Sequence, residues 1–243
     1  MTKSRNLVRG CGFFLLFFMP TNPIRLIILD FDGTLADTSR VIIATMQATF
    51  KQMNMTIPNA DQVKSVIGLP LKECFTHLMP MDDDTARRCT ETYREIFDQK
   101  NQALAPQPFP NVDSTLHRLH NDGLSLAIAS SRSTRSLEEF IDRFGWNGLF
   151  SDVIGADKVT KAKPHPEPVE RILADLHFLP KDALVVGDTP YDIWMGKNAS
   201  TRTCAVTYGN AQLESLSEAK PDWVIDDFEK IESLILQQNG KIK

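Results

Sequence analysis

Residues 24–38 read Ile-Arg-Leu-Ile-Ile-Leu-Asp-Phe-Asp-Gly-Thr-Leu-Ala-Asp-Thr, and this stretch decides the fold class. Its first six residues are mostly aliphatic, which is typical of a strand buried on both faces of a sheet. The run ends in two carboxylates, Asp30 and Asp32. Because residues i and i+2 of an extended segment share a face, both carboxylates can point toward one ligand. Two adjacent carboxylates repel each other, so we expect a divalent cation beside them.

Further short apolar runs alternate with amphipathic stretches along most of the chain. This alternation predicts an α/β fold, a Rossmann-like parallel sheet in a three-layer α/β/α core. The expected strands cover residues 24–29, 124–129, 183–186, 204–207 and 223–225. Parallel strands need crossover connections, and the expected helices between them cover residues 114–121, 137–144, 166–176 and 191–198.

One region breaks the alternation, because it carries helix signals and no convincing strand. In it, Gly68 is expected to end a second helix and Pro70 to open a third. We therefore predict an inserted α-helical unit over residues 38–105. The α/β core then comprises residues 24–37 and 106–243, and residues 1–23 form an N-terminal extension.

The N-terminus has the charge order of a signal peptide, since three basic residues precede the apolar run 13–19. The run is shorter than the roughly 20 apolar residues that a membrane span needs, and no cleavage motif follows it. We expect translation to begin at Met19, or residues 1–18 to be a loose extension, rather than secretion or membrane insertion.

Charge and cysteine content exclude several classes of function. The 243 residues carry 27 basic and 31 acidic side chains, a net charge of −4, which disfavours a nucleic-acid partner. The four cysteines, Cys11, Cys74, Cys89 and Cys204, are far apart and form no C-x-x-C pair. They indicate neither a disulfide framework nor a zinc site, and they fit a reducing cytoplasm.

Polar residues also follow the other expected strands. Ser130-Ser131-Arg132 puts a hydroxyl beside a helix N-terminus, which suits a phosphate oxygen, although Ser131 is equally suited to capping that helix. Lys163 stands in the segment Lys-Pro-His-Pro, where proline restricts the backbone. Asp188 and Asp192 form a second carboxylate pair, in which Asp192 has the alternative reading of a first-turn helix acid.

These four motifs, in this order, resemble those of the haloacid dehalogenase superfamily of aspartate-nucleophile phosphatases. The helical insertion directly after the first motif is similar to that superfamily's members with a helical cap. Residues 66–71, Val-Ile-Gly-Leu-Pro-Leu, and residues 161–168 resemble phosphoglycolate phosphatases and a related pyrophosphatase more loosely. The resemblance covers residues 24 to about 231 and implies a helical cap that closes over the site.

The resemblance also implies roles for individual residues. Asp30 would be the nucleophile, and Asp32 would protonate the leaving oxygen and later deprotonate water. Mg²⁺ would be held by Asp30, Asp188 and the backbone carbonyl of Asp32, with Asp192 supporting this group from behind.

The remaining residues of these motifs would bind the substrate. Ser130 and Lys163 would grip the transferring phosphate, and Gly33, Thr34 and Ser131 would add further donors. Arg132 stands where related phosphatases often have another residue pair, and it would contact phosphate, substrate or only solvent.

The resulting prediction is a Mg²⁺-dependent phosphatase of a small phosphorylated metabolite, as a monomer or homodimer without nucleic-acid or membrane partners. Phosphoglycolate is the leading substrate, followed by inorganic pyrophosphate or a nucleoside monophosphate. A sugar phosphomutase shares the catalytic set, whereas Asp32 argues against a 2-haloacid dehalogenase. A non-catalytic protein that only accepts phosphate is the alternative from a different class.

Overall fold

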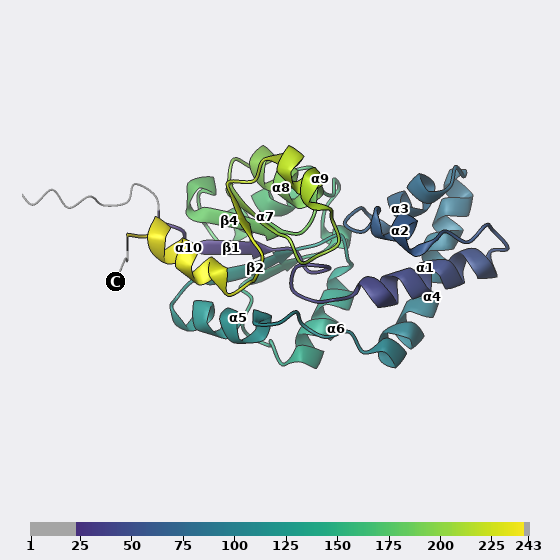
Figure 1. The fold of residues 1–243 in the computed structure, drawn as a ribbon, viewed down its shortest axis with the longest axis horizontal. Helices are drawn as coiled ribbons and strands as arrows, with labels where there is room; N and C mark the ends of the chain where they lie inside the picture. The colour runs from purple at the N-terminus through teal and green to yellow at the C-terminus, as the bar shows by residue number, and fades with distance from the viewer. Residues whose placement is uncertain (1–22, 241–243) are drawn as a thin grey trace, which may run out of the picture.

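The computed structural model describes residues 23–240 (Figure 1). Its centre is a six-stranded sheet in which every neighbouring pair of strands is parallel, in the order β3-β2-β1-β4-β5-β6. The strands are β1 (Leu26–Leu29), β2 (Ser125–Ala129), β3 (Asp152–Ile154), β4 (Ala183–Gly187), β5 (Arg202–Val206) and β6 (Trp223–Ile225).

The central strand β1 explains why the sheet is covered on both faces. All four of its residues are buried, and consecutive side chains point to opposite faces. Ile27 and Leu29 join one apolar cluster, while Leu26 and Ile28 join the other. A strand of this kind needs helices on both sides, as parallel sheets generally do.

The helices form the two outer layers (Figure 1). One layer packs on the side of Ile27 and Leu29 and contains α5 (Val112–Asn121), α6 (Thr134–Phe144) and α10 (Lys230–Gln238). The opposite layer contains α7 (Glu167–Asp175), α8 (Pro190–Asn198) and α9 (Leu213–Ala219). Two short 3-10 turns, η1 (Ala156–Lys158) and η2 (Pro180–Asp182), complete the core. The predicted three-layer α/β architecture is confirmed.

The segment between β1 and α5 is helical and lies beside one end of the sheet (Figure 1). It consists of α1 (Ser39–Gln52), α2 (Ala60–Lys64), α3 (Leu71–Leu78) and α4 (Asp83–Leu104), which we call the cap. Aromatic side chains join three of these helices, because Phe75 of α3 packs on Phe50 of α1 and on Tyr93 of α4. Within α4, Tyr93 stacks on Phe97.

Several local features differ from the sequence prediction. The edge strand β3 was not predicted, because its three residues, Asp-Val-Ile, begin with a charged side chain and form no apolar run. Helix α2 ends at Lys64, so Gly68 lies in the turn that follows it rather than at the helix end. Strand β5 begins two residues earlier than expected, at Arg202.

Two expectations concern the ends of the chain and membranes. The proposed extension and the start at Met19 fall on residues 1–22, outside the described residues. Among residues 23–240, no helix combines the length and apolar character that crossing a bilayer requires.

Candidate active site

The candidate site lies where the order of the sheet changes direction. Strand β1 has β2 and then β3 on one side, and β4, β5 and β6 on the other. In open α/β sheets, ligands bind beyond the carboxyl ends of the strands at such a point. Asp30 follows β1 there, and Asp188 follows β4.

The turn after β1 brings these two strand ends into contact. The amides of Leu35 and Ala36 both donate to the carbonyl of Phe31, so the chain reverses tightly. Gly33 makes this turn with a φ of +92°. A Cβ at Gly33 would lie 2.1 Å from Oδ2 of Asp188, so both the backbone angle and the space require glycine here.

Lys163 is buried beneath two of the carboxylates and bridges them. Its Nζ donates to Oδ1 of Asp30 at 2.5 Å and to Oδ1 of Asp192 at 2.6 Å. Burial opposes the charge of this ammonium group, but Asp192 and Asp30 together raise its pKa. The other oxygen of Asp192 accepts from the amide and hydroxyl of Thr189, at 3.0 and 2.7 Å. Both carboxylate oxygens of Asp192 therefore have hydrogen-bond partners that fix the side chain.

Three carboxylates converge close enough to share a cation. Asp30, Asp188 and Asp192 each offer an oxygen within 4.8 Å of the others, and all three are buried. Burial raises the pKa of Asp30 well above its usual range, with further contributions from Asp192 and Asp188, although Lys163 lowers it. Burial and Asp192 raise the pKa of Asp188 to about 7. One buried ammonium group, that of Lys163, thus accompanies three buried carboxylates.

The same donor set suits a hard divalent cation. Buried carboxylate oxygens are the ligands that Mg²⁺ prefers, and an added positive charge would relieve their mutual repulsion. The residues present therefore fit the metal that the sequence implies.

Asn210, which follows β5, connects two parts of this centre. Its backbone amide donates to Oδ2 of Asp188 at 2.7 Å, and its side-chain Nδ2 lies 3.1 Å from the same oxygen. Nδ2 also lies 3.3 Å from the backbone carbonyl of Asp32. Thr34 assists by donating its hydroxyl to Oδ1 of Asp188 at 3.2 Å.

The serines expected to bind phosphate lie at the end of β2. Ser130 is buried, and its Oγ accepts from the amide of Arg132 at 3.3 Å. The hydroxyl of Ser131 donates to the carbonyl of Gly68 in the cap, at 2.6 Å. The alternative reading of Ser131 as a helix cap is wrong, because Ser133 occupies the N-cap position of α6. Ser131 instead links the core to the cap.

Arg132 is buried and paired with the predicted acid–base residue. Its Nη2 lies 2.6 Å from Oδ1 of Asp32, and its Nε lies 3.1 Å from Oδ2. Burial works against the charge of this guanidinium, but Asp32 raises its pKa overall. The sequence left open whether Arg132 contacts phosphate, substrate or only solvent. The last of these is wrong, because the Arg132 side chain is only 8% exposed.

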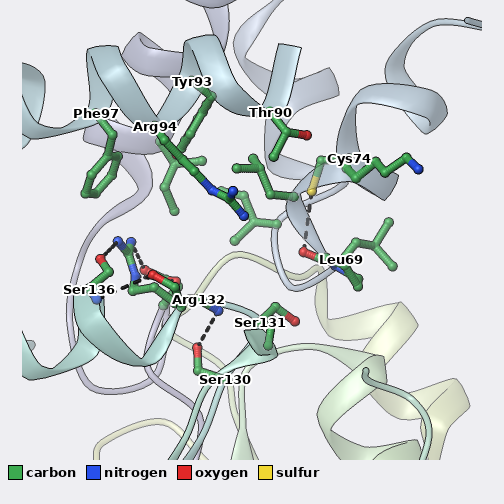
Figure 2. Close-up of a pocket in the computed structure, with 18 of the residues that line it drawn as sticks. Leu69, Cys74, Thr90, Tyr93, Arg94, Phe97, Ser130, Ser131, Arg132 and Ser136 are labelled. Carbon is green, nitrogen blue, oxygen red and sulfur yellow. Dashed lines mark hydrogen bonds and ion pairs between the residues drawn. The ribbon is translucent and has the colours of Figure 1, made fainter. Parts of the chain in front are cut away.

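These residues face a cavity of about 430 Å³ between the core and the cap (Figure 2). The core contributes Asp30, Asp32, Ser130, Ser131 and Arg132. The cap contributes mostly apolar side chains from α1, α4 and the turn between α2 and α3, including Met46, Leu69, Tyr93 and Phe97. Lys163, Asp188 and Asp192 lie behind this surface and support Asp30. The cavity thus joins a reactive wall to a wall that can contact the rest of a substrate.

The sequence model of the haloacid dehalogenase-like hydrolases matches residues 27–206, which include all four motifs. The chain belongs to this family.

Members of the family align over nearly the whole chain. A pyrophosphatase, PpaX, of Oceanobacillus iheyensis is 35% identical over 214 residues, covering 87% of this chain and 97% of the relative. A phosphoglycolate phosphatase of Aquifex aeolicus is 31% identical, covering 79% of this chain and 88% of its own. The crystal structure of a predicted phosphoglycolate phosphatase from Haemophilus somnus superposes with a TM-score of 0.79 at 25% identity, covering 87% and 97% of the two chains. The family resemblance read from the motifs is confirmed.

Proposed function

We propose that this hydrolase is a Mg²⁺-dependent phosphatase that cleaves small phosphate monoesters through a phosphoryl-aspartate. The observation that carries the proposal is the position of Asp30, which faces the cavity while Lys163 holds one of its carboxylate oxygens from behind. A nucleophile fixed in this way needs little rearrangement to reach a phosphorus atom placed above it.

In the first half-reaction, a carboxylate oxygen of Asp30 attacks phosphorus, and the bond between phosphorus and the leaving oxygen breaks. Asp32 donates a proton to that oxygen, so the leaving group departs as a neutral hydroxyl. Lys163 and the hydroxyl of Ser130 would stabilise the charge on the transferring group.

In the second half-reaction, a water attacks the same phosphorus, and the bond between Asp30 and phosphorus breaks. Asp32, now a carboxylate, takes the proton of the water and is ready for another cycle. Inorganic phosphate is released. Closure of the cap over the cavity, where Ser131 already bonds to Gly68, would exclude other water.

Asp30, Asp188 and the backbone carbonyl of Asp32 would hold Mg²⁺, and Asp192 would support them through Lys163 and Thr189. When bound, the ion supplies positive charge that neutralises the carboxylates and orients phosphate oxygens. Asn210 would fix the geometry, because it contacts both Asp188 and the carbonyl of Asp32.

The substrate we favour is phosphoglycolate, with inorganic pyrophosphate as the second candidate. The relatives named above support both, since one is called a phosphoglycolate phosphatase and another a pyrophosphatase. A cavity of about 430 Å³ suits a small metabolite. The three buried free thiols, Cys74, Cys89 and Cys204, are consistent with the cytoplasmic location we propose.

The proposal is tested by measuring phosphate release from phosphoglycolate, pyrophosphate, a nucleoside monophosphate and a sugar phosphate. Each substrate is assayed with Mg²⁺, with EDTA, and with Asp30→Asn as the control variant. We expect turnover that depends on both the metal and Asp30. Conversion of a sugar phosphate into its isomer would favour a mutase, and the absence of turnover on every compound would favour a protein that only binds phosphate.

A further inference from the structure

The starting observation is that Asp32 has both carboxylate oxygens occupied. Oδ1 accepts from Arg132 and also from the hydroxyl of Thr38, at 2.6 and 2.5 Å. Oδ2 accepts from Nε of Arg132 at 3.1 Å. These three bonds orient the carboxylate of Asp32 toward Arg132 and Thr38. Asp32 can turn toward the leaving oxygen of a substrate only when the pair with Arg132 opens.

Arg132 has partners other than Asp32. Its guanidinium lies 4.8 Å from the ring centre of Phe97 and 5.0 Å from that of Phe140, and its Nη1 lies 3.0 Å from Oγ of Ser136. Phe97 belongs to the cap, whereas Phe140 and Ser136 belong to α6. These contacts can keep Arg132 in place when Asp32 turns away.

A buried guanidinium that loses its carboxylate is costly unless another anion replaces it. The replacement has to come from the cavity, because Arg132 lines it (Figure 2). A phosphate ester brings one anionic group to Asp30. A second anion, carried on the leaving group, is the group available to pair with Arg132.

The cap places another cation in the same cavity. Arg94 of α4 lines the cavity and extends into it from the side opposite Ser130 (Figure 2). Within residues 23–240, no hydrogen bond or ion pair of Arg94 is found, although Arg132 on the core side is fully paired. Arg94 therefore brings a positive charge to the cap side of the cavity, which Lys72 and the carboxylate of Asp98 also line.

We propose that Arg132 selects substrates whose leaving group carries a second anionic group, by exchanging Asp32 for that group. The exchange breaks one ion pair and forms another, so the buried charge of Arg132 stays compensated. Asp32 is then free to turn toward the leaving oxygen. This inference rests on the proposed phosphatase activity and narrows its substrates to esters such as phosphoglycolate, in which a carboxylate accompanies the phosphate.

The test compares three substrates that differ in whether the leaving group carries a second anion and in whether it needs a proton from Asp32. Phosphoglycolate carries the second anion, and 2-hydroxyethyl phosphate has a similar size but a neutral hydroxymethyl group in its place. The third, 4-nitrophenyl phosphate, releases a phenolate that needs no proton from Asp32. Values of kcat and KM are measured with Mg²⁺ for the wild type, Arg132→Gln and Arg132→Lys.

The wild type is expected to prefer phosphoglycolate over 2-hydroxyethyl phosphate by about ten-fold or more in kcat/KM. Arg132→Gln should lower kcat/KM for phosphoglycolate by about thirty-fold or more, because a buried charge partner is lost. The losses on the other two substrates should be at least about ten-fold smaller, since neither leaving group offers Arg132 an anion. Arg132→Lys keeps the positive charge but cannot make two parallel hydrogen bonds to a carboxylate. Its kcat/KM for phosphoglycolate should therefore lie between those of the wild type and Arg132→Gln.

The matched control is Arg87→Gln, which removes an arginine from the same protein at an exposed position of α4, where it pairs with Asp84 and Glu91. This variant should behave as the wild type on all three substrates. Thermal melting checks that each variant is folded. If Arg132→Gln does not fold, Arg132→Lys and the wild-type preference still test the inference.

Three results would overturn the inference. Equal losses on all three substrates would give Arg132 a structural role only. A wild type that cleaves 4-nitrophenyl phosphate but does not prefer the anionic ester would refute the selection and leave the phosphatase proposal intact. A wild type that cleaves none of the three would refute both.

Discussion

The two walls of the cavity differ in how their polar groups are held. On the core wall, Asp30 and Asp188 are buried and contact partners from several strand ends. On the cap wall, most side chains are apolar, and Arg94 is exposed to the cavity without a partner among the described residues. A fixed polar network suits a reaction common to many substrates, whereas a mostly apolar wall with a few charged side chains suits selection among them.

Substituting the core wall should have the largest effect on activity. Asp30→Asn removes the nucleophile and should lower kcat by more than about a thousand-fold, as loss of a covalent catalyst does in other enzymes. The fold should be retained, because burial already raises the pKa of this carboxyl and the amide has a similar shape. Phosphate release and thermal melting check the two statements, and activity near the wild-type level would contradict the role of Asp30.

The next largest effect is expected on stability, at Lys163. Lys163→Met leaves Asp30 and Asp192 buried without their cation and should reduce the free energy of unfolding by about 3–5 kcal/mol in EDTA. Chemical denaturation measures this loss. The control is Lys230→Ala, which breaks the exposed pair with Asp226 and should cause no measurable change. Equal effects of the two variants would remove the distinction between buried and exposed ion pairs.

The carboxylates of the core wall also predict how stability depends on pH. The pKa of Asp188 is about 7 in the folded chain, against an ordinary value of 3.8. Between these values the folded state binds more protons than the unfolded state, so stability in EDTA should fall as pH rises from about 4 to 7.

Mg²⁺ should weaken or reverse this trend, because it binds the deprotonated carboxylates and stabilises the folded state more at high pH. Melting temperatures at pH 5 and pH 8, with Mg²⁺ and with EDTA, measure both trends. Asp188→Asn should flatten the dependence seen in EDTA. A melting temperature that rises with pH in EDTA would contradict the assignment.

The smallest effect is expected on the cap wall. Arg94→Gln should raise KM for phosphoglycolate several-fold and leave kcat nearly unchanged, because an exposed cation contributes to binding in the ground state and in the transition state alike. The matched control is Arg87→Gln, which replaces an exposed arginine of the same helix. A fall in kcat without a change in KM would place Arg94 in the chemistry instead of in selection.

The core wall could be predicted from sequence far better than the cap wall, for a physical reason. Asp30, Ser130 and Asp188 each follow an apolar run directly, and the carboxyl ends of parallel strands must meet at one edge. Their proximity therefore follows from the chain's local pattern and the order of the strands. The metal-binding group predicted from Asp30 and Asp188 depends only on this rule.

Contacts that depend on side-chain direction could not be predicted in this way. Arg132 and Asp32 are 100 positions apart, and nothing in either segment specifies that they pair. Thr38 stands at the N-cap position of α1, but its hydroxyl donates to Asp32 and makes no cap hydrogen bond. The role of Asn210 had one signal in the sequence, its place after β5, and this signal does not reveal what the side chain contacts.

The central claim is that Asp30 accepts the phosphoryl group, and a single-turnover experiment with Asp32→Asn and 4-nitrophenyl phosphate tests it most directly. The phenolate departs without a proton, whereas hydrolysis of the phosphoryl-aspartate lacks its base. Acid quenching followed by mass analysis of the peptides should locate one phosphoryl group on Asp30, matched by an equal burst of nitrophenolate. A burst with phosphate on another residue, or turnover with no phosphorylated peptide at any time, would contradict the account.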